Sequence, residues 1–188
     1  MSDRKPLESL VDAYGLALTE LGATHPRLAV YSAAAPEADP FGEFLARFPD
    51  RFFRVEGHEP KMIGMAATTA ADGGTVFASG PSALVAGRSY SAVRTVSAAG
   101  ANVKVVATDG GFPAEGTPTT RPMMEDIGLM RDLPGMAVVV PADARTTQSA
   151  VRVLAGASGP AYLRLTGEPL PHIGHDSFQL GRAAVVHS

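Results

Sequence analysis

The sequence predicts an α/β domain of three layers, in which helices cover both faces of a mostly parallel sheet of about six strands. Two observations support this class. Short apolar runs alternate along the chain with segments of helical period, and these runs are nearly continuous rather than alternately polar, as in strands buried on both faces. The chain also has 188 residues and is 45% hydrophobic, which is enough for one globular core.

The first half of the chain contains three strands that alternate with helices. Apolar residues repeat with a helical period from Leu7 until Gly22 ends the pattern, and an Asp-Gly-Gly sequence at 72–74 ends a later helix. In order, we expect a helix over residues 7–21, a strand over 28–31, a helix over 40–48, a strand over 52–55, a helix over 60–71 and a strand over 75–78.

The second half continues the alternation. Asp143, which follows the run "VVVP", is a suitable N-cap for the helix after it. We expect a helix over residues 82–98, a strand over 103–107, a loop rich in Gly, Pro and Thr over 109–122, a helix over 123–131, a strand over 137–140, a helix over 144–155 and a strand over 161–165. The pattern decays after Leu170, so we expect a domain over residues 1–170 and a linker or tail over 171–188.

Composition excludes several classes of protein. A net charge of −3 and a pI near 5.9 leave no basic field for a nucleic acid. Without cysteine there is neither a disulfide nor a thiolate metal site. No apolar run reaches about 18 residues and the charged N-terminus lacks a signal core, so we expect a cytoplasmic protein with no membrane partner. The low charged fraction, 19%, fits either a surface covered by partner subunits or simply an Ala- and Gly-rich sequence.

Polar residues gather after two of the predicted strands, in the sequence "EGHE" at 56–59 and in the loop over 109–121. Parallel α/β sheets bind ligands at the carboxyl ends of their strands. Pro60 presets the first turn of the next helix and so fixes the direction of Glu59. The residues alone also allow Glu59 to be an ordinary acid in a first helical turn, and Glu56 and His58 to be capping or surface groups.

Five collinear blocks add a resemblance over roughly residues 28–170. They are "RFPDRFFRVEGHEPKMIGMAA", "FASGPSALVAGRSYSAVR", "NVKVVATDGG", "MEDIGLMRDLPGMAVVVPAD" and "GPAYLRL". In order and spacing they resemble the pyrimidine-binding domain of transketolase and its thiamine diphosphate-dependent relatives. The segment "FQLGRAAVV" is also similar to the one that leads into that family's third domain. The resemblance implies the thiamine diphosphate-binding fold of the pyrimidine type.

The resemblance places the family's catalytic glutamate at Glu59. In this family a carboxylate hydrogen-bonded to N1′ of the aminopyrimidine favours the tautomer whose 4′-imino group can take the thiazolium proton. The protein supplies orientation and a proton partner, while the coenzyme stabilises the carbanion. Charge-assisted hydrogen bonds of this kind are short and strong in a dry site.

Other positions depart from the family pattern on the coenzyme side. The aromatic residues that flank the aminopyrimidine fall on Pro81, Leu84 and Gly87, which would be the coenzyme-binding residues here. An apolar wall could survive through the first two, but the stacking face would be lost. The acid found after the first strand of the domain falls on Ala34.

The substrate side departs further. Two histidines that handle substrate oxygens fall on Asp109 and Arg121, and His58 could also reach the substrate. Asp removes a hydrogen-bond donor, whereas Arg121 adds a forked cation suited to a carboxylate or phosphate, although it could equally be a surface arginine. The family's acid that hydrogen-bonds a substrate hydroxyl falls on Thr117, and the family's arginine that binds a sugar phosphate falls on Gly167. The resemblance thus implies ketol or acyl transfer on a non-standard ketose or α-keto acid.

Half of the expected site is absent from this sequence. We find no GDG segment with a distal Asn pair, and we expect no metal ligand in this chain. The resemblance implies that a separate subunit holds Mg²⁺ and the diphosphate, that the coenzyme lies between the two chains, and that the assembly is of α2β2 type. The family's C-terminal domain would then be a third gene product or have been lost by truncation.

The sequence therefore predicts a transferase of two-carbon groups that is active only with its partner. Two other readings stay open. One is a non-catalytic assembly or regulatory subunit derived from such a domain. The other is an unrelated flavodoxin-like domain that binds a different ligand by itself.

Overall fold

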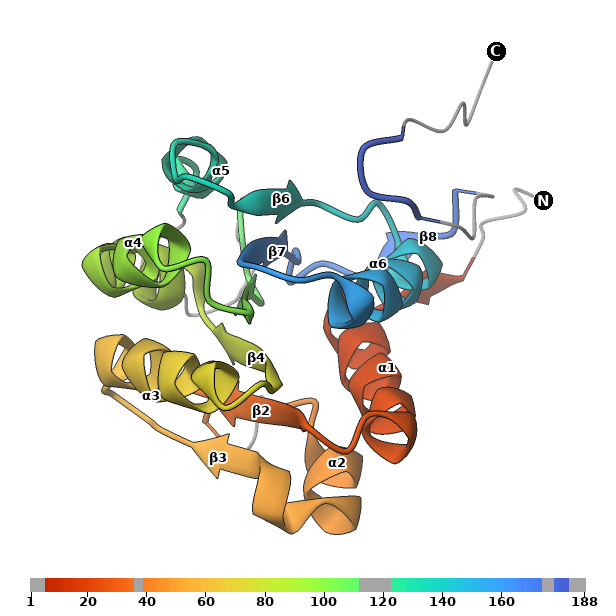
Figure 1. Cartoon of the computed structure of the whole chain (residues 1–188). Coiled ribbons are helices and arrows are strands. Elements are labelled where there is room, and N and C mark those ends of the chain that lie inside the picture. The colour runs from red at the N-terminus through yellow and green to blue at the C-terminus, as the bar shows by residue number, and fades with distance from the viewer. Residues whose placement is uncertain (1–5, 36–38, 112–122, 174–177, 183–188) are drawn as a thin grey trace, which may run out of the picture.

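The computed structural model describes residues 6–35, 39–111, 123–173 and 178–182. At its centre lies a six-stranded sheet in the order β3-β2-β4-β5-β7-β6, in which every neighbouring pair is parallel (Figure 1). The strands are β2 (Leu28–Ser32), β3 (Phe52–Arg54), β4 (Thr75–Gly80), β5 (Val103–Ala107), β6 (Ala137–Val139) and β7 (Ala161–Arg164). The predicted fold class is confirmed.

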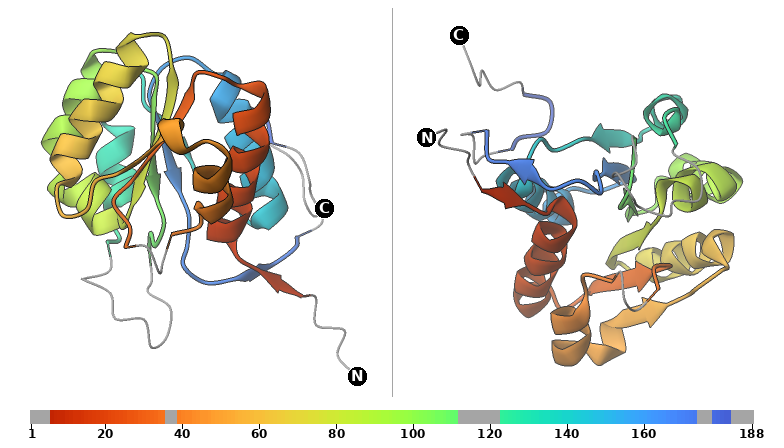
Figure 2. Two further views of the ribbon diagram at one scale, coloured as in Figure 1. Left: turned by 90° about the horizontal axis from the view of Figure 1, so that it is seen from below. Right: turned by 180° about the vertical axis from the view of Figure 1, so that it is seen from behind.

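Helices cover both faces of this sheet, as Figure 2 shows in its left view. One face is packed against α1 (Leu10–Thr24), α2 (Gly42–Arg47) and α6 (Ala144–Gly156). The other is packed against α3 (Glu59–Ala71), the π-helical turn η3 (Ala83–Arg88), α4 (Tyr90–Ala98) and α5 (Asp126–Arg131). A short 3₁₀ turn, η2 (Pro49–Arg51), leads into β3. None of the helices that the structure describes is long and apolar enough to cross a bilayer.

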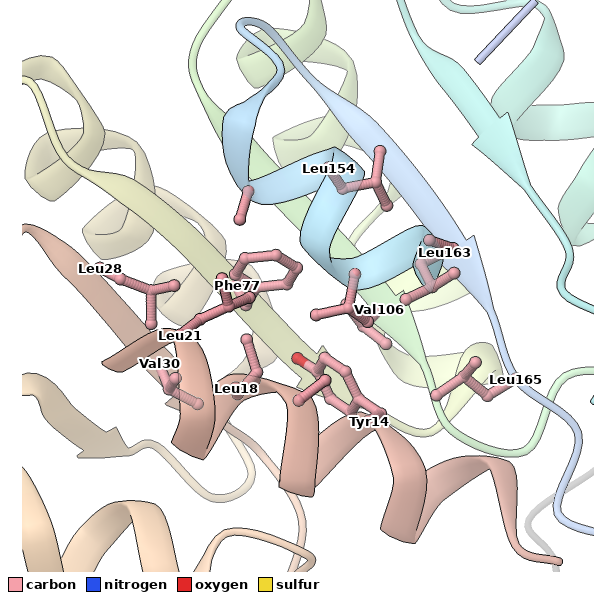
Figure 3. Close-up of a cluster of buried hydrophobic side chains, with 14 of the residues drawn as sticks. Tyr14, Leu18, Leu21, Leu28, Val30, Phe77, Val106, Leu154, Leu163 and Leu165 are labelled. Carbon is pink, nitrogen blue, oxygen red and sulfur yellow. The ribbon is translucent and has the colours of Figure 1, made fainter. Parts of the chain in front are cut away.

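The core between the sheet and α1 surrounds Tyr14 and Phe77, both fully buried (Figure 3). Their ring centroids lie 6.1 Å apart. The Tyr14 hydroxyl pairs with the hydroxyl of Ser79 at 2.7 Å, because a buried phenol needs a hydrogen-bond partner. This contact ties α1 to β4 next to the carboxyl end of the strand.

A fully buried lysine interrupts the apolar run of β5. The Lys104 ammonium donates to the carbonyl oxygens of Ala157 at 2.8 Å and Gly159 at 2.6 Å, in the turn between α6 and β7. Burial lowers the pKa of Lys104 to about 8. Its hydrogen bonds hold this turn against the amino ends of the strands.

The largest differences from the predicted elements lie near the N-terminus and in the helices expected over residues 82–98 and 123–131. The first helix begins at Leu10, because the Ser9 side chain accepts from the Asp12 amide at 3.1 Å and caps it. Residues ahead of it form β1 (Leu7–Glu8), which pairs antiparallel with β8 (Leu170–Pro171). The helix expected over residues 82–98 is divided at Ser89 into η3 and α4, and the helix expected from 123 begins at Asp126.

The predicted N-cap at Asp143 is confirmed. Its side chain forms a capping box with Thr146, and its second oxygen accepts from the Ile173 amide at 2.9 Å and pairs with Nδ1 of His172 at 2.8 Å. Burial raises the pKa of Asp143, but the hydrogen bonds from Thr146, Ile173 and His172 outweigh it and bring the pKa to about 2. Residues just beyond 170 therefore contact α6, and the division at 170 stays a prediction.

Candidate active site

The sequence "EGHE" lies between β3 and α3, at the carboxyl edge of the sheet. Gly57 has a φ of +69°, a left-handed conformation that favours glycine and reverses the chain there. His58 is the N-cap residue of α3, and Glu59 is the first residue of the helix. The helix thus begins one residue earlier than predicted, with Glu59 inside its first turn and Pro60 behind it.

Glu59 differs sharply from its polar neighbours in burial. Its side chain is 2% exposed, whereas Glu56 and His58 are more open to solvent. Nδ1 of His58 lies 3.1 Å from the Glu56 carbonyl oxygen, so this histidine makes a local turn contact. Of the three polar side chains in "EGHE", the structure buries only the carboxylate that the resemblance singles out.

The Glu59 carboxylate meets a cation that sequence reasoning missed. Nη1 of Arg88 lies 3.5 Å from its Oε2, and the Arg88 side chain is 60% exposed. The amino end of α3 also favours a negative charge at this position. Arg88 gave no signal in the sequence, because its approach to Glu59 depends on how η3 packs against α3.

The predicted coenzyme wall lies on the segment that follows β4. Pro81, Leu84 and Gly87 are half-buried, while Val85 and Ala86 between them are fully buried in the core. Each of these three residues is therefore partly open to solvent.

Asp109 leaves the end of β5 and turns toward the same segment. Its Oδ1 accepts from the Ser82 amide at 2.8 Å, where the turn of η3 begins. A β-carbon at Gly167 would stand 4.0 Å from the Asp109 side chain, so these two positions are neighbours. In the structure, Asp109 thus accepts a hydrogen bond from the backbone at the start of η3, and its contact with a substrate stays a prediction. Arg121 and Thr117 lie outside the described residues.

A buried ion pair underlies the start of the Asp109 loop. Nε of Arg164, at the end of β7, donates to Oδ2 of Asp126 at 3.0 Å, and the Tyr162 hydroxyl donates to the same oxygen at 2.7 Å. Burial raises the pKa of Tyr162, and Asp126 raises it further. A β-carbon on Gly110 would stand 2.5 Å from Arg164, so the backbone approaches the arginine too closely for a larger residue. The signal for this pair was a charged residue within the apolar run "YLRL".

A second ion pair lies after β2, next to Ala34, the position at which the resemblance led us to expect the family's acid. Nη1 of Arg54 lies 2.6 Å from Oδ2 of Asp39 and donates to the Ala34 carbonyl oxygen at 2.9 Å. Burial raises the pKa of Asp39 despite the arginine. An acid is therefore present near this strand end, but it comes from a position five residues further along the chain.

No group of three or more His, Asp or Glu side chains within the described residues is arranged to hold a metal ion.

Comparisons with known proteins agree with this architecture. The family model described as transketolase, pyrimidine binding domain, matches residues 9–171. The chain is 38% identical over 153 residues to a putative transketolase C-terminal section of Methanocaldococcus jannaschii, covering 81% of this chain and 48% of that protein. It is 34% identical over 180 residues to a 6-deoxy-6-sulfo-D-fructose transketolase subunit of a Clostridium species, covering 94% and 56%.

Among solved structures, a split-gene transketolase described as an inactive β4 tetramer superposes with a TM-score of 0.87 at 33% identity. The match covers 97% of this chain and 60% of that one. The chain thus spans about half the length of the curated relatives that it matches. From the family match and these relatives, the chain belongs to the transketolase family, in which it corresponds to the pyrimidine-binding domain.

Proposed function

We propose that this chain is a subunit of a thiamine diphosphate-dependent transketolase-like enzyme, in which Glu59 is the carboxylate that holds the coenzyme's aminopyrimidine. The observation that carries this proposal is the burial of Glu59 at the carboxyl edge of the sheet, in the first turn of α3. A buried carboxylate is costly unless it has a partner. The contact between Glu59 and the exposed Arg88 is long, so the Glu59 carboxylate could form a stronger hydrogen bond with another partner.

The wall that we assign to the coenzyme's ring would be apolar rather than aromatic. Pro81 and Leu84 offer a half-buried apolar face on the segment that packs against α3. When bound, thiamine diphosphate supplies the electron sink that lets carbon–carbon bonds be made and broken. Glu59 would hold the proton at the N1′ atom of the aminopyrimidine, while the apolar face excludes water from that hydrogen bond.

The diphosphate and Mg²⁺ would be held by a partner chain. In the described part of this chain we find no acidic cluster for a divalent ion. We propose a separate diphosphate-binding subunit and a cytoplasmic α2β2 assembly. The relative described as an inactive β4 tetramer supports the idea that such chains need a partner.

The substrate would be a non-standard ketose or an α-keto acid. Gly167 stands where the family's phosphate-gripping arginine falls, and Asp109, Arg121 and His58 are the residues we assign to the substrate. One Asp109 oxygen is already bound to the Ser82 amide, so only its other oxygen would read a substrate hydroxyl. The Clostridium relative, named for a sulfonated ketose, supports an unusual donor.

Reconstitution with the diphosphate-binding partner, Mg²⁺ and thiamine diphosphate tests the proposal. Turnover of a ketose panel should fall at least about 100-fold in Glu59→Gln, because a neutral amide cannot hold the N1′ proton in the same way. Glu56→Gln is the matched control, since this acid is exposed three residues away, and should keep wild-type turnover. Full activity in Glu59→Gln would remove the proposed role.

The absence of aromatic side chains at positions 81, 84 and 87 favours one alternative, a non-catalytic assembly or regulatory subunit. Titration calorimetry separates the two functions. An assembly subunit would form the complex but show no Mg²⁺-dependent coenzyme binding, whereas the enzyme subunit would bind the coenzyme in the complex.

A further inference from the structure

Arg88 is the cation that the fold brings to the Glu59 carboxylate. The pair is unequal, because the Glu59 side chain is 2% exposed and the Arg88 side chain is 60% exposed. Its Nη1–Oε2 distance of 3.5 Å lies at the outer limit for a hydrogen bond. The carboxylate is thus fixed and buried, while the guanidinium is held loosely and from the solvent side.

The π-helical turn accounts for the position of Arg88. The Ser89 amide and its hydroxyl both donate to the Leu84 carbonyl oxygen, at 3.0 and 2.8 Å, which closes a turn one residue wider than in an α-helix. The widened turn changes which side chains face α3. A β-carbon on Gly87 would make an ordinary 3.4 Å contact with the end of the Met123 side chain, so the turn also lies next to Met123. Such π-turns occur frequently at functional sites.

Burial explains why Glu59 needs this cation when no coenzyme is present. An ionised carboxylate removed from water loses solvation, and a neighbouring cation recovers part of that loss. If the N1′ atom of the aminopyrimidine becomes the carboxylate's partner, the long contact with Arg88 is the weaker of the two and is the one to be lost.

We propose that Arg88 is the counter-ion of Glu59 in the coenzyme-free chain and gives up the carboxylate when the coenzyme binds. This inference rests on the proposed function of Glu59. Arg88 is then a positioning residue rather than a coenzyme ligand. It stabilises one of two states, and a contact made only in the free state lowers the affinity for the ligand.

The sign of the effect on affinity follows. In Arg88→Met the free state loses its ion pair while the bound state loses nothing, so the coenzyme should bind more tightly. Because the Arg88 side chain is 60% exposed, we expect a coupling at the low end of the usual range, roughly a 5-fold lower Kd. A residue that contacted the bound coenzyme would instead give a higher Kd.

The experiment has two readouts. The first is thermal unfolding of the full chain without coenzyme, in wild type, Arg88→Met, Arg88→Lys, Glu59→Gln and the double variant Glu59→Gln/Arg88→Met. Arg88→Met should lower Tm when Glu59 is present, whereas Arg88→Lys should keep Tm close to that of the wild type. The double variant should have the same Tm as the single variant Glu59→Gln. Arg94→Met, at an exposed arginine of α4, is the matched control and should leave Tm unchanged.

The second readout is titration calorimetry of thiamine diphosphate on the complex with the partner subunit and Mg²⁺. Tighter binding by Arg88→Met supports the proposal, together with coupling in the melting cycle. If Arg88→Met lowers Tm equally in wild type and in the Glu59→Gln variant, or weakens coenzyme binding, the proposal is overturned and the role of Glu59 is left intact. A wild-type complex that binds no coenzyme would overturn both this inference and the proposed function.

Discussion

Arg164 and Asp126 form a buried ion pair that joins the two sides of the candidate substrate region. Nε of Arg164 donates to Oδ2 of Asp126 at 3.0 Å, and the side chains are 17% and 0% exposed. The guanidinium also lies against the backbone of Gly110 and Gly111, just after Asp109. The Gly111 amide in turn donates to the Met123 carbonyl oxygen at 3.2 Å, so these two residues lie side by side. The Arg164 side chain therefore contacts both the Gly110–Gly111 backbone and Asp126.

Replacement of Arg164 should be strongly destabilising. Within the described residues, Oδ1 of Asp126 is buried without a hydrogen-bond partner, so loss of the arginine would leave a buried carboxylate with only the Tyr162 hydroxyl. Arg164→Met should lower the free energy of unfolding by about 3 kcal/mol, the usual result of breaking one side of a buried pair. Urea unfolding measures it. Arg152→Met, in an exposed pair with Glu20, is the control and should change stability by less than about 1 kcal/mol. Similar values for the two variants would contradict the role assigned to Arg164.

Replacement of Gly111 by alanine should lower the free energy of unfolding more than the same replacement at Gly57, another glycine with a left-handed conformation. Gly111 has a φ of +91° and a new side chain would collide with the Arg164 guanidinium, whereas Gly57 has a φ of +69° and open space around it. Gly57→Ala should lower the free energy of unfolding by about 1 kcal/mol, from backbone strain alone. Gly111→Ala should lose clearly more, because the ion pair must also move. Chemical denaturation of both variants measures this difference. Equal decreases in the free energy of unfolding would show that the Arg164 side chain moves aside without a cost in stability.

Stability at acid pH should depend on Asp143. Its pKa in the folded chain is about 2, below the ordinary value of 3.8, so the folded state favours the ionised form. The resulting stabilisation is present above pH 3.8 and is lost as the pH falls from there toward 2. In wild type the free energy of unfolding should drop through this window more steeply than in Asp143→Asn. Parallel curves would mean that the Thr146, Ile173 and His172 hydrogen bonds do not favour the charge.

Stability at alkaline pH should depend on Lys104, and here too the free energy of unfolding should rise with pH. Its folded pKa of about 8 lies below the ordinary 10.5, so the folded chain releases this proton before the unfolded chain does. The unfolded state then binds more protons between pH 8 and 10.5, and the free energy of unfolding rises with pH through that window. Relative to Lys104→Met, wild type should gain at most about 3 kcal/mol by pH 10.5. A flat difference would show that the Ala157 and Gly159 carbonyls hold the charge without a shift in pKa.

Much of the fold was predictable from local patterns. The apolar strand runs, the helix end near Gly73 and the N-cap at Asp143 all depend on residues close together in the sequence, and each appears in the structure. The pairing of β1 with β8 was missed because it joins residues 7–8 to 170–171 through a short, weakly apolar contact. The division of the helix at Ser89 was missed because a π-turn leaves the apolar periodicity nearly unchanged.

The sequence by itself determined the order of the six central strands and of the helices between them, and it indicated Glu59 as a candidate through the blocks that surround it. Only the tertiary structure decided that this carboxylate is buried, that Arg88 approaches it, and that Asp109 is bound to the Ser82 amide. Hydrophobic periodicity depends on residues that are close together in the chain, so it can be recognised in the sequence alone. Counter-ions and hydrogen-bond partners come from segments far apart in the chain, here 29 residues for Glu59 and Arg88, and are fixed only when the helices and strands pack.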